Sequence, residues 1–161
     1  MMDFCFAVEK PLGRLAKWLR ILGFDTLYEP DLPEGSFNGL EPERILLTQR
    51  TPIRQERAGQ PQVVIRSDHY WEQLLEVVRA AGITAGSIRP FSRCICCNSE
   101  IKPAAKADVQ GKVPDYVWET HAVFRICPGC RRIYWSGSHL ERSMARIRSL
   151  FNGQPLDALC P

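Results

Sequence analysis

The sequence predicts an α/β protein, with a parallel sheet flanked by helices and a small cysteine-rich module after it. In the first half of the 161 residues, short apolar runs alternate with helical patterns, which is typical of a parallel sheet. Beyond residue 90 this alternation stops, and two Cys-x-x-Cys pairs appear instead. We therefore expect two domains, residues 1–89 and residues 90–161.

The first strand and the first helix have the clearest local patterns. Phe4–Val8 is a compact apolar run, and Pro11 suits the first turn of a helix. A leucine stripe with spacings of 3, 4 and 3 residues follows and ends just before Gly23. Its members are Leu12, Leu15, Leu19 and Leu22.

Three more strands and one helix complete the first half. We expect strands at 24–28, 45–48 and 62–65, because short segments with apolar, β-branched or aromatic residues alternate here with helical patterns. Ser67-Asp68 would cap a helix over 70–81, with Gly82 beyond its end. Residues 29–43 are rich in proline and glycine, and we expect a loop there with at most one short turn of helix.

The second half has weaker patterns. Pro114-Asp115 predicts a helix start, and residues 133–135 predict a short strand. Ser138 and Glu141 match the Ser-x-x-Glu capping box. The helix that they would open carries one apolar side, made of Leu140, Met144, Ile147 and Phe151.

The two cysteine pairs predict a structural zinc site. Cys94 and Cys97 form one pair, Cys127 and Cys130 the other, and a gap of two residues lets both thiolates of a pair converge on one ion. Pro128-Gly129 in the second pair favours the tight turn that this convergence needs. The alternatives are two disulfides or cysteines that are simply buried.

Charge and hydropathy limit the class of partner. The formal net charge is +3, and the basic excess lies beyond residue 90, which weakly favours a polyanion as partner. No apolar run approaches the roughly 18 residues that span a bilayer, and the first residues do not resemble a secretion signal. We expect no membrane partner and a cytosolic location, where thiols are reduced or bound to metal.

Polar side chains follow each expected strand. Glu9 follows the first, Asp31 lies shortly after the second, Arg50 follows the third and Asp68 the fourth. Ligands of open α/β sheets bind beyond the carboxyl ends of the strands. Carboxylates that converge there can hold Mg²⁺ or Mn²⁺ and promote phosphodiester cleavage. The alternative is that these are ordinary polar loop residues.

Four stretches resemble the mutator-seven C-terminal RNase family, and they cover nearly the whole chain in order. They are residues 8–26, 44–48, 90–94 and 127–139. The resemblance implies a PIN-like nuclease fold followed by a zinc ribbon, with acidic residues that hold a divalent metal for RNA cleavage. Two positions depart from the family pattern. Glu9 stands where Asp is usual, and the usual Thr-Arg-Asp reads Thr48-Gln49-Arg50 here.

This departure predicts a degenerate catalytic site. Glu9, Asp31 and Asp68 would hold the Mg²⁺ or Mn²⁺ of an active enzyme, and Glu34 is a further candidate. Arg50 keeps its positive charge at physiological pH and would compete with a cation for these carboxylates. We therefore expect a PIN-like protein that acts on RNA with weakened or lost cleavage. The alternative is a non-catalytic RNA-binding or protein-docking module stabilised by zinc.

Basic side chains supply the expected RNA contacts. Arg14 and Lys17 lie on the first helix, and the others lie in or after the second cysteine pair: Arg131, Arg132, Arg142 and Arg146. Guanidinium and ammonium groups bind phosphates, and for the first helix a solvated face is the alternative. Tyr134 and Trp135 near the second group would either stack on bases or pack the core of the ribbon. His139 is expected either to contact nucleic acid or to form local bonds in a helix turn. The sequence allows a protein partner and predicts no oligomeric state.

Overall fold

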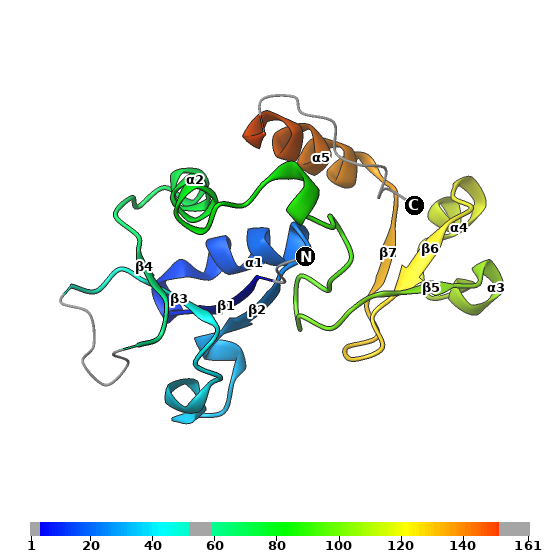
Figure 1. Cartoon of the computed structure of the whole chain (residues 1–161). Coiled ribbons are helices and arrows are strands. Elements are labelled where there is room, and N and C mark those ends of the chain that lie inside the picture. Colours follow the sequence, from blue (N-terminus) through cyan, green and yellow to red (C-terminus); the bar gives the residue numbers. More distant parts are fainter. Residues whose placement is uncertain (1–3, 52–58, 152–161) are drawn as a thin grey trace.

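The computed structural model describes residues 4–51 and 59–151 and contains two sheets (Figure 1). The first sheet has four parallel strands in the order β2-β1-β3-β4. Its strands are β1 Cys5–Val8, β2 Asp25–Tyr28, β3 Ile45–Thr48 and β4 Gln62–Val64. This confirms the predicted parallel sheet flanked by helices.

Helices cover one face of this sheet. These are α1 Gly13–Ile21, which follows a short 3-10 turn, and α2 Tyr70–Ala81, and both lie beside the sheet in Figure 1. Phe6, Val8 and Leu47 point from the strands into the same hydrophobic cluster as the leucine stripe of α1. The stripe is fully buried there, as its helical spacing predicts.

The loop between β2 and β3 covers the opposite face. Ala7 and Leu46, which alternate with the helix-facing residues, contact Phe37 from this loop. The loop contains two 3-10 turns, Glu29–Asp31 and Ser36–Gly39, rather than the single turn expected. Since the sheet is covered on both faces, its central strands β1 and β3 are mostly apolar, whereas the outer strand β2 carries Asp25 and Thr26.

The second sheet is antiparallel, in the order β5-β6-β7. Its strands are β5 Lys102–Ala104, β6 Phe124–Ile126 and β7 Ile133–Trp135, with α3 Lys106–Val109 and α4 Asp115–Thr120 between the first two. A small cluster of Val109, Val113, Val117 and Phe124 fills the space between them. We call residues 91–137 the ribbon module.

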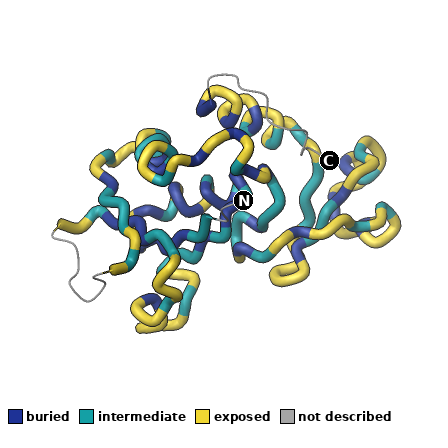
Figure 2. Tube along the Cα trace, in the orientation of Figure 1, coloured by how far each residue is buried: buried dark blue, intermediate teal, exposed yellow. Residues whose placement is uncertain are grey.

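Helix α5, Ser138–Leu150, returns from the ribbon module to the first sheet (Figure 1). Met144, Ile147 and Leu150 belong to the same hydrophobic cluster as Phe6 and Leu15. The tube in Figure 2 shows one side of this helix buried and the other exposed. Apolar contacts therefore cross the domain boundary expected near residue 90, and that boundary stays a prediction.

Both predicted helix caps are wrong. The residue before α5 is Gly137, with extended backbone at φ −120° and no side-chain cap bond, and Ser138 is already helical. Before α2 the cap position belongs to His69, again without a side-chain bond. Glu76 instead accepts hydrogen bonds from the backbone N–H groups of Arg66 and Ser67, at 2.9 Å each. The α2 stop is as predicted, since Gly82 has a left-handed φ of 70°.

Among the residues that the structure describes, no helix has the length and apolar character needed to cross a membrane.

Candidate functional site

The four predicted cysteines form a compact centre. Their sulfur atoms all lie within 4.8 Å of one another. Cys94 Sγ is 3.5 Å from Cys130 Sγ, and Cys97 Sγ is 3.3 Å from Cys127 Sγ. A tetrahedral zinc site with bonds of about 2.3 Å has S–S edges of roughly 3.8 Å. The donor set and its spacing therefore fit one zinc ion, and the thiols are free rather than paired in disulfides.

The two cysteine pairs have the same backbone fold. The N–H of Cys94 donates to Ser99 O and the N–H of Asn98 donates to Cys94 O, at 2.8 and 2.9 Å. In the second pair, the N–H of Cys127 donates to Arg132 O and the N–H of Arg131 donates to Cys127 O, at 2.9 Å each. Asn98 and Arg131, which hold equivalent positions, both have left-handed backbone, with φ of 67° and 63°. The two turns thus present their thiols to one point from opposite sides.

The thiols are electrostatically unequal. Burial opposes ionisation of Cys97, but hydrogen bonding with Ser99 outweighs it and lowers the pKa of Cys97 to about 6. A backbone hydrogen bond with Arg132 favours the Cys130 thiolate, but burial and the neighbouring thiols raise the pKa of Cys130 to about 12. Four thiolates so close together repel one another, and a bound cation removes this repulsion.

Tyr134 supports the centre from β7. Its hydroxyl lies 3.0 Å from Cys94 Sγ. Burial, together with the adjacent sulfur, raises the pKa of Tyr134, so the phenol stays protonated and can donate to a thiolate. Outer hydrogen bonds of this kind orient metal ligands.

Two polar side chains fasten the first cysteine turn to the first sheet. The buried Arg20 of α1 donates to Ile95 O and Cys96 O at 3.2 and 2.9 Å, and to Thr26 O at 3.0 Å. Asn98 accepts from the N–H of Thr26 at 3.0 Å. The metal centre is therefore built directly against β2.

Gly23 permits this close approach. It has a φ of 94°, and a Cβ atom there would lie only 2.2 Å from Arg89 O. The segment that enters the ribbon module can thus bond to the end of α1. Arg89 N donates to Leu22 O and Phe91 N donates to Ile21 O, at 2.9 and 2.8 Å.

Glu9 lies buried at the carboxyl edge of the first sheet. Its Oε2 accepts a hydrogen bond of 2.7 Å from the Thr48 hydroxyl, and it lies 3.8 Å from Arg50 Nε. Thr48 Oγ1 in turn accepts from the backbone N–H of Arg50 at 3.0 Å. The guanidinium thus forms an ion pair with the carboxylate from a largely exposed position, with 62% of its side chain accessible.

The other predicted acidic residues have separate partners. Asp31 Oδ2 is 2.9 Å from Arg20 Nη2, and Asp68 accepts from Gln49 Nε2 at 3.4 Å. Asp68 also lines an open depression with Gln49 and Thr51, and Glu34 is exposed in the β2–β3 loop. Within residues 4–51 and 59–151, the cysteine set is the one group of three or more potential ligands close enough to share an ion. Glu9, Asp31 and Asp68 are not brought together in this way.

The predicted basic residues divide into two groups, and all are exposed. Arg14 and Arg146, from α1 and α5, both lie over the ring of Tyr70, at 5.5 and 5.9 Å from its centroid. Lys17 is one turn from Arg14 along α1, and Arg142 is one turn from Arg146 along α5. Arg131 and Arg132 lie apart from these in the second cysteine turn.

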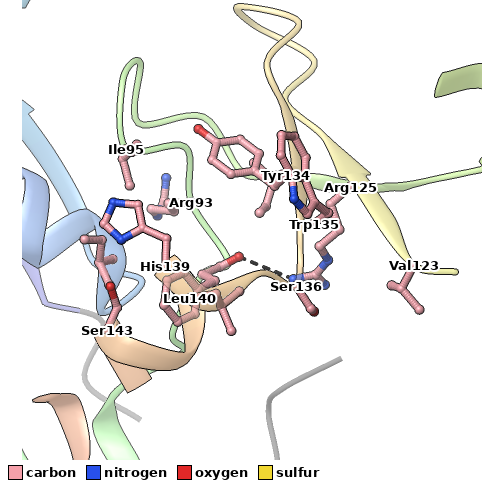
Figure 3. A pocket seen from close by; sticks show the side chains of 13 residues that line it. Arg93, Ile95, Val123, Arg125, Tyr134, Trp135, Ser136, His139, Leu140 and Ser143 are labelled. Atoms are coloured by element: carbon pink, nitrogen blue, oxygen red, sulfur yellow. Dashed lines mark hydrogen bonds between the residues drawn. The ribbon is translucent and has the colours of Figure 1, made fainter. Parts of the chain in front are cut away.

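An apolar pocket of about 190 Å³ separates the ribbon module from α5 (Figure 3). Tyr134 and Trp135 line it from β7, while His139 and Leu140 line it from α5. Arg125 spans one side through a 3.3 Å hydrogen bond to Phe91 O. His139 is exposed here, and its predicted roles stay untested.

The fold and the cysteine centre define an α/β protein with a parallel sheet and a module whose four cysteines could hold a metal ion. A family model described as Mut7-C RNAse domain matches residues 5–147. This is most of the chain, and the protein therefore belongs to that family, as its opening helix and paired cysteines predict. Membership supports a nuclease-like domain that acts on RNA. No curated protein and no solved structure matches the chain.

Proposed function

We propose that this chain is a PIN-like protein that binds RNA through a degenerate phosphodiesterase site, with little or no metal-dependent cleavage. Its two domains are residues 1–89 and 90–161, and zinc in the cysteine centre has a structural role. The six basic residues named above supply contacts to the RNA. The cytosol is the proposed location, because reduced thiols are what the metal centre needs.

The single observation that carries this proposal is the ion pair between Arg50 and Glu9. The carboxylate that would lead a metal site already has a hydroxyl donor in Thr48 and a cation in Arg50. Mg²⁺ needs near-ideal octahedral coordination by several oxygens. Among the described residues, Asp31 and Asp68 do not complete such a set with Glu9, which supports a site with little or no metal-dependent cleavage.

The same edge is suited to a phosphate. Arg50 presents a largely exposed guanidinium, and guanidinium groups bind phosphate oxygens through paired N–H donors. Glu9 and the backbone contact to Thr48 would hold Arg50 in place while the outer face of the guanidinium meets the phosphodiester. A protein of this kind binds RNA and leaves it intact.

The test is cleavage and binding of one labelled RNA pool, with Mg²⁺ or Mn²⁺, by the wild type, Glu9→Ala and the control Glu119→Ala, at an exposed glutamate of α4. We expect binding that weakens steeply as salt rises, with little cleavage by any of the three. Efficient metal-dependent cleavage that Glu9→Ala abolishes and Glu119→Ala preserves would overturn the degenerate site and establish an active nuclease. Absence of RNA binding would overturn the proposal altogether.

A further inference from the structure

A cluster of aromatic side chains lies where α1, α2 and α5 meet. Tyr70 stacks with His69 at 5.0 Å and with Trp18 at 6.4 Å between ring centroids. Trp71 meets Trp18 edge-on at 5.3 Å. We call these four residues the aromatic cluster.

Two arginines flank the cluster from different helices. Arg14 lies over the Tyr70 ring, and Arg146 contacts both Tyr70 and Trp71, at 5.9 and 5.6 Å from their centroids. Arg146 also donates a hydrogen bond to the Tyr70 hydroxyl. Each guanidinium is therefore held in position by a ring while remaining exposed to solvent.

The cluster is only partly a packing feature. Trp18 and Trp71 rest against the main hydrophobic cluster, but His69 and Tyr70 are not members of it. His69 is exposed, and Tyr70 is half-buried. The outer side of the cluster thus offers aromatic and cationic groups together at the protein surface.

Its place in the fold connects it to the Glu9 edge. Arg14 is in the first turn of α1, which follows β1 and Glu9, and Tyr70 begins α2, which follows β4. In a parallel sheet, the helices that follow the strands begin at the carboxyl edge. An extended ligand bound to the aromatic cluster can therefore continue along the protein surface toward Glu9 and Arg50.

We propose that the aromatic cluster binds unpaired nucleotides of single-stranded RNA. A base would stack on the exposed ring of His69, which Tyr70 supports from its other face, and Arg14 and Arg146 would contact the flanking phosphates. Lys17 and Arg142 extend the positive charge by one helical turn on each side. Paired bases in an A-form duplex have no free faces for such stacking, so the site selects single strands. This inference rests on the proposed function and adds the form of RNA that is bound.

The test measures the affinity of three labelled oligomers of equal length at fixed salt: a single-stranded uridine oligomer, an RNA duplex and an abasic strand. Tyr70→Leu keeps apolar bulk but removes the ring, and Tyr116→Leu, at a tyrosine with 68% exposure on α4, is its control. We expect Tyr70→Leu to weaken binding of the uridine oligomer by roughly 5- to 150-fold, the range for loss of one stacked base. Binding of the abasic strand should change less than twofold.

A second pair of variants keeps the proposal testable if Tyr70→Leu does not fold. Arg146→Ala should weaken binding and lower the salt dependence by about one phosphate contact, whereas Arg148→Ala on the same helix should leave the salt dependence unchanged. A folded Tyr70→Leu that binds the uridine oligomer like the wild type would overturn this inference alone, as would equal affinity for the duplex. Failure of the wild type to bind any RNA would overturn the proposed function as well.

Discussion

Arg20 joins Asp31 to the first cysteine turn. One guanidinium donates to Asp31 Oδ2 at 2.9 Å and also to the carbonyl oxygens of Ile95 and Cys96. The metal centre and the acidic loop after β2 therefore share one buried side chain. Their positions are coupled even though more than 60 residues separate them in the sequence.

Arg20→Ala should strongly destabilise the protein. It removes the donor of three carbonyl oxygens, and a buried polar group left without its partner costs about 1–3 kcal/mol. The loss of Asp31 as a partner adds little, since that carboxylate is 42% exposed and can be solvated. Lys17→Ala, on the exposed side of the same helix, should change the free energy of unfolding by less than about 0.5 kcal/mol. Urea denaturation of both variants measures the difference, and equal stabilities would contradict the role given to Arg20.

Zinc removal should unfold the ribbon module. Metal analysis should find about one zinc per chain, because the described residues contain one cluster of four cysteines that could hold an ion. A chelator should abolish the near-ultraviolet signal of the ribbon tryptophans, Trp118 and Trp135, since the fold of such modules depends on the metal. Cys127→Ser should do the same without a chelator, whereas Cys5→Ser should retain the metal. A metal-free ribbon module that still unfolds cooperatively would contradict this.

Arg50→Asp should restore metal-dependent cleavage if Arg50 is the residue that prevents a divalent metal from binding at Glu9. The change removes the cation paired with Glu9 and supplies a further oxygen ligand. A bound metal ion lowers the barrier by several kcal/mol, and about 1.4 kcal/mol already gives a tenfold change in rate. We expect at least about tenfold more cleavage with Mn²⁺, with Arg66→Asp as the control. An unchanged cleavage rate would contradict the role given to Arg50.

Asp25 should make stability sensitive to acid. Burial opposes ionisation of its carboxyl, but hydrogen bonds from Arg44 and Asn98 outweigh burial and hold the pKa of Asp25 below its usual 3.8. A carboxyl with a lowered folded pKa stabilises the fold above pH 3.8, and this contribution is lost as the pH falls through the folded value. The wild type should therefore be more stable than Asp25→Asn at pH 7, and the difference should shrink below about pH 4. Urea midpoints at several pH values measure it, and a difference that grows in acid would contradict the assignment.

Arg131→Gly should leave the thermal stability nearly unchanged, whereas Arg132→Gly should lower it. Arg131 has a φ of 63°, a conformation that costs a side-chain-bearing residue about 1–2 kcal/mol and glycine almost nothing. This relief should offset the greater entropy that glycine loses on folding. Arg132 lacks a positive φ, and glycine there should cost roughly 0.5–1 kcal/mol. Thermal unfolding of the zinc-loaded variants compares them.

The sequence predicts local features well where burial and spacing agree. Strand β1 is recognisable because both faces of its sheet are covered, and α1 is recognisable by its leucine stripe. The cysteine spacing located the metal centre, and Asn98 carries a signal for left-handed backbone because asparagine tolerates it. The equivalent conformation at Arg131 has no such signal.

The contacts that sequence reasoning missed join distant residues. Arg20 reaches Cys96 across 76 positions, and Arg146 reaches Tyr70 across 76 as well. No local pattern specifies such pairs, because each residue alone resembles an ordinary basic residue on a helix. The caps failed for a different reason. Backbone geometry at Gly137 starts α5 one residue earlier than a serine cap would allow.

The contribution of α5 to the first core affects how the chain folds during synthesis. The first sheet and helices α1 and α2 leave the ribosome first. Ile147, which completes their hydrophobic cluster, follows about 65 residues after the end of α2. At about 5–20 residues per second, this interval lasts roughly 3–13 s. Throughout it, apolar surface of the nascent α/β half remains in contact with water or with a chaperone. The four cysteines of the intervening ribbon module emerge within the same interval, so the first core closes only after that module has been synthesised.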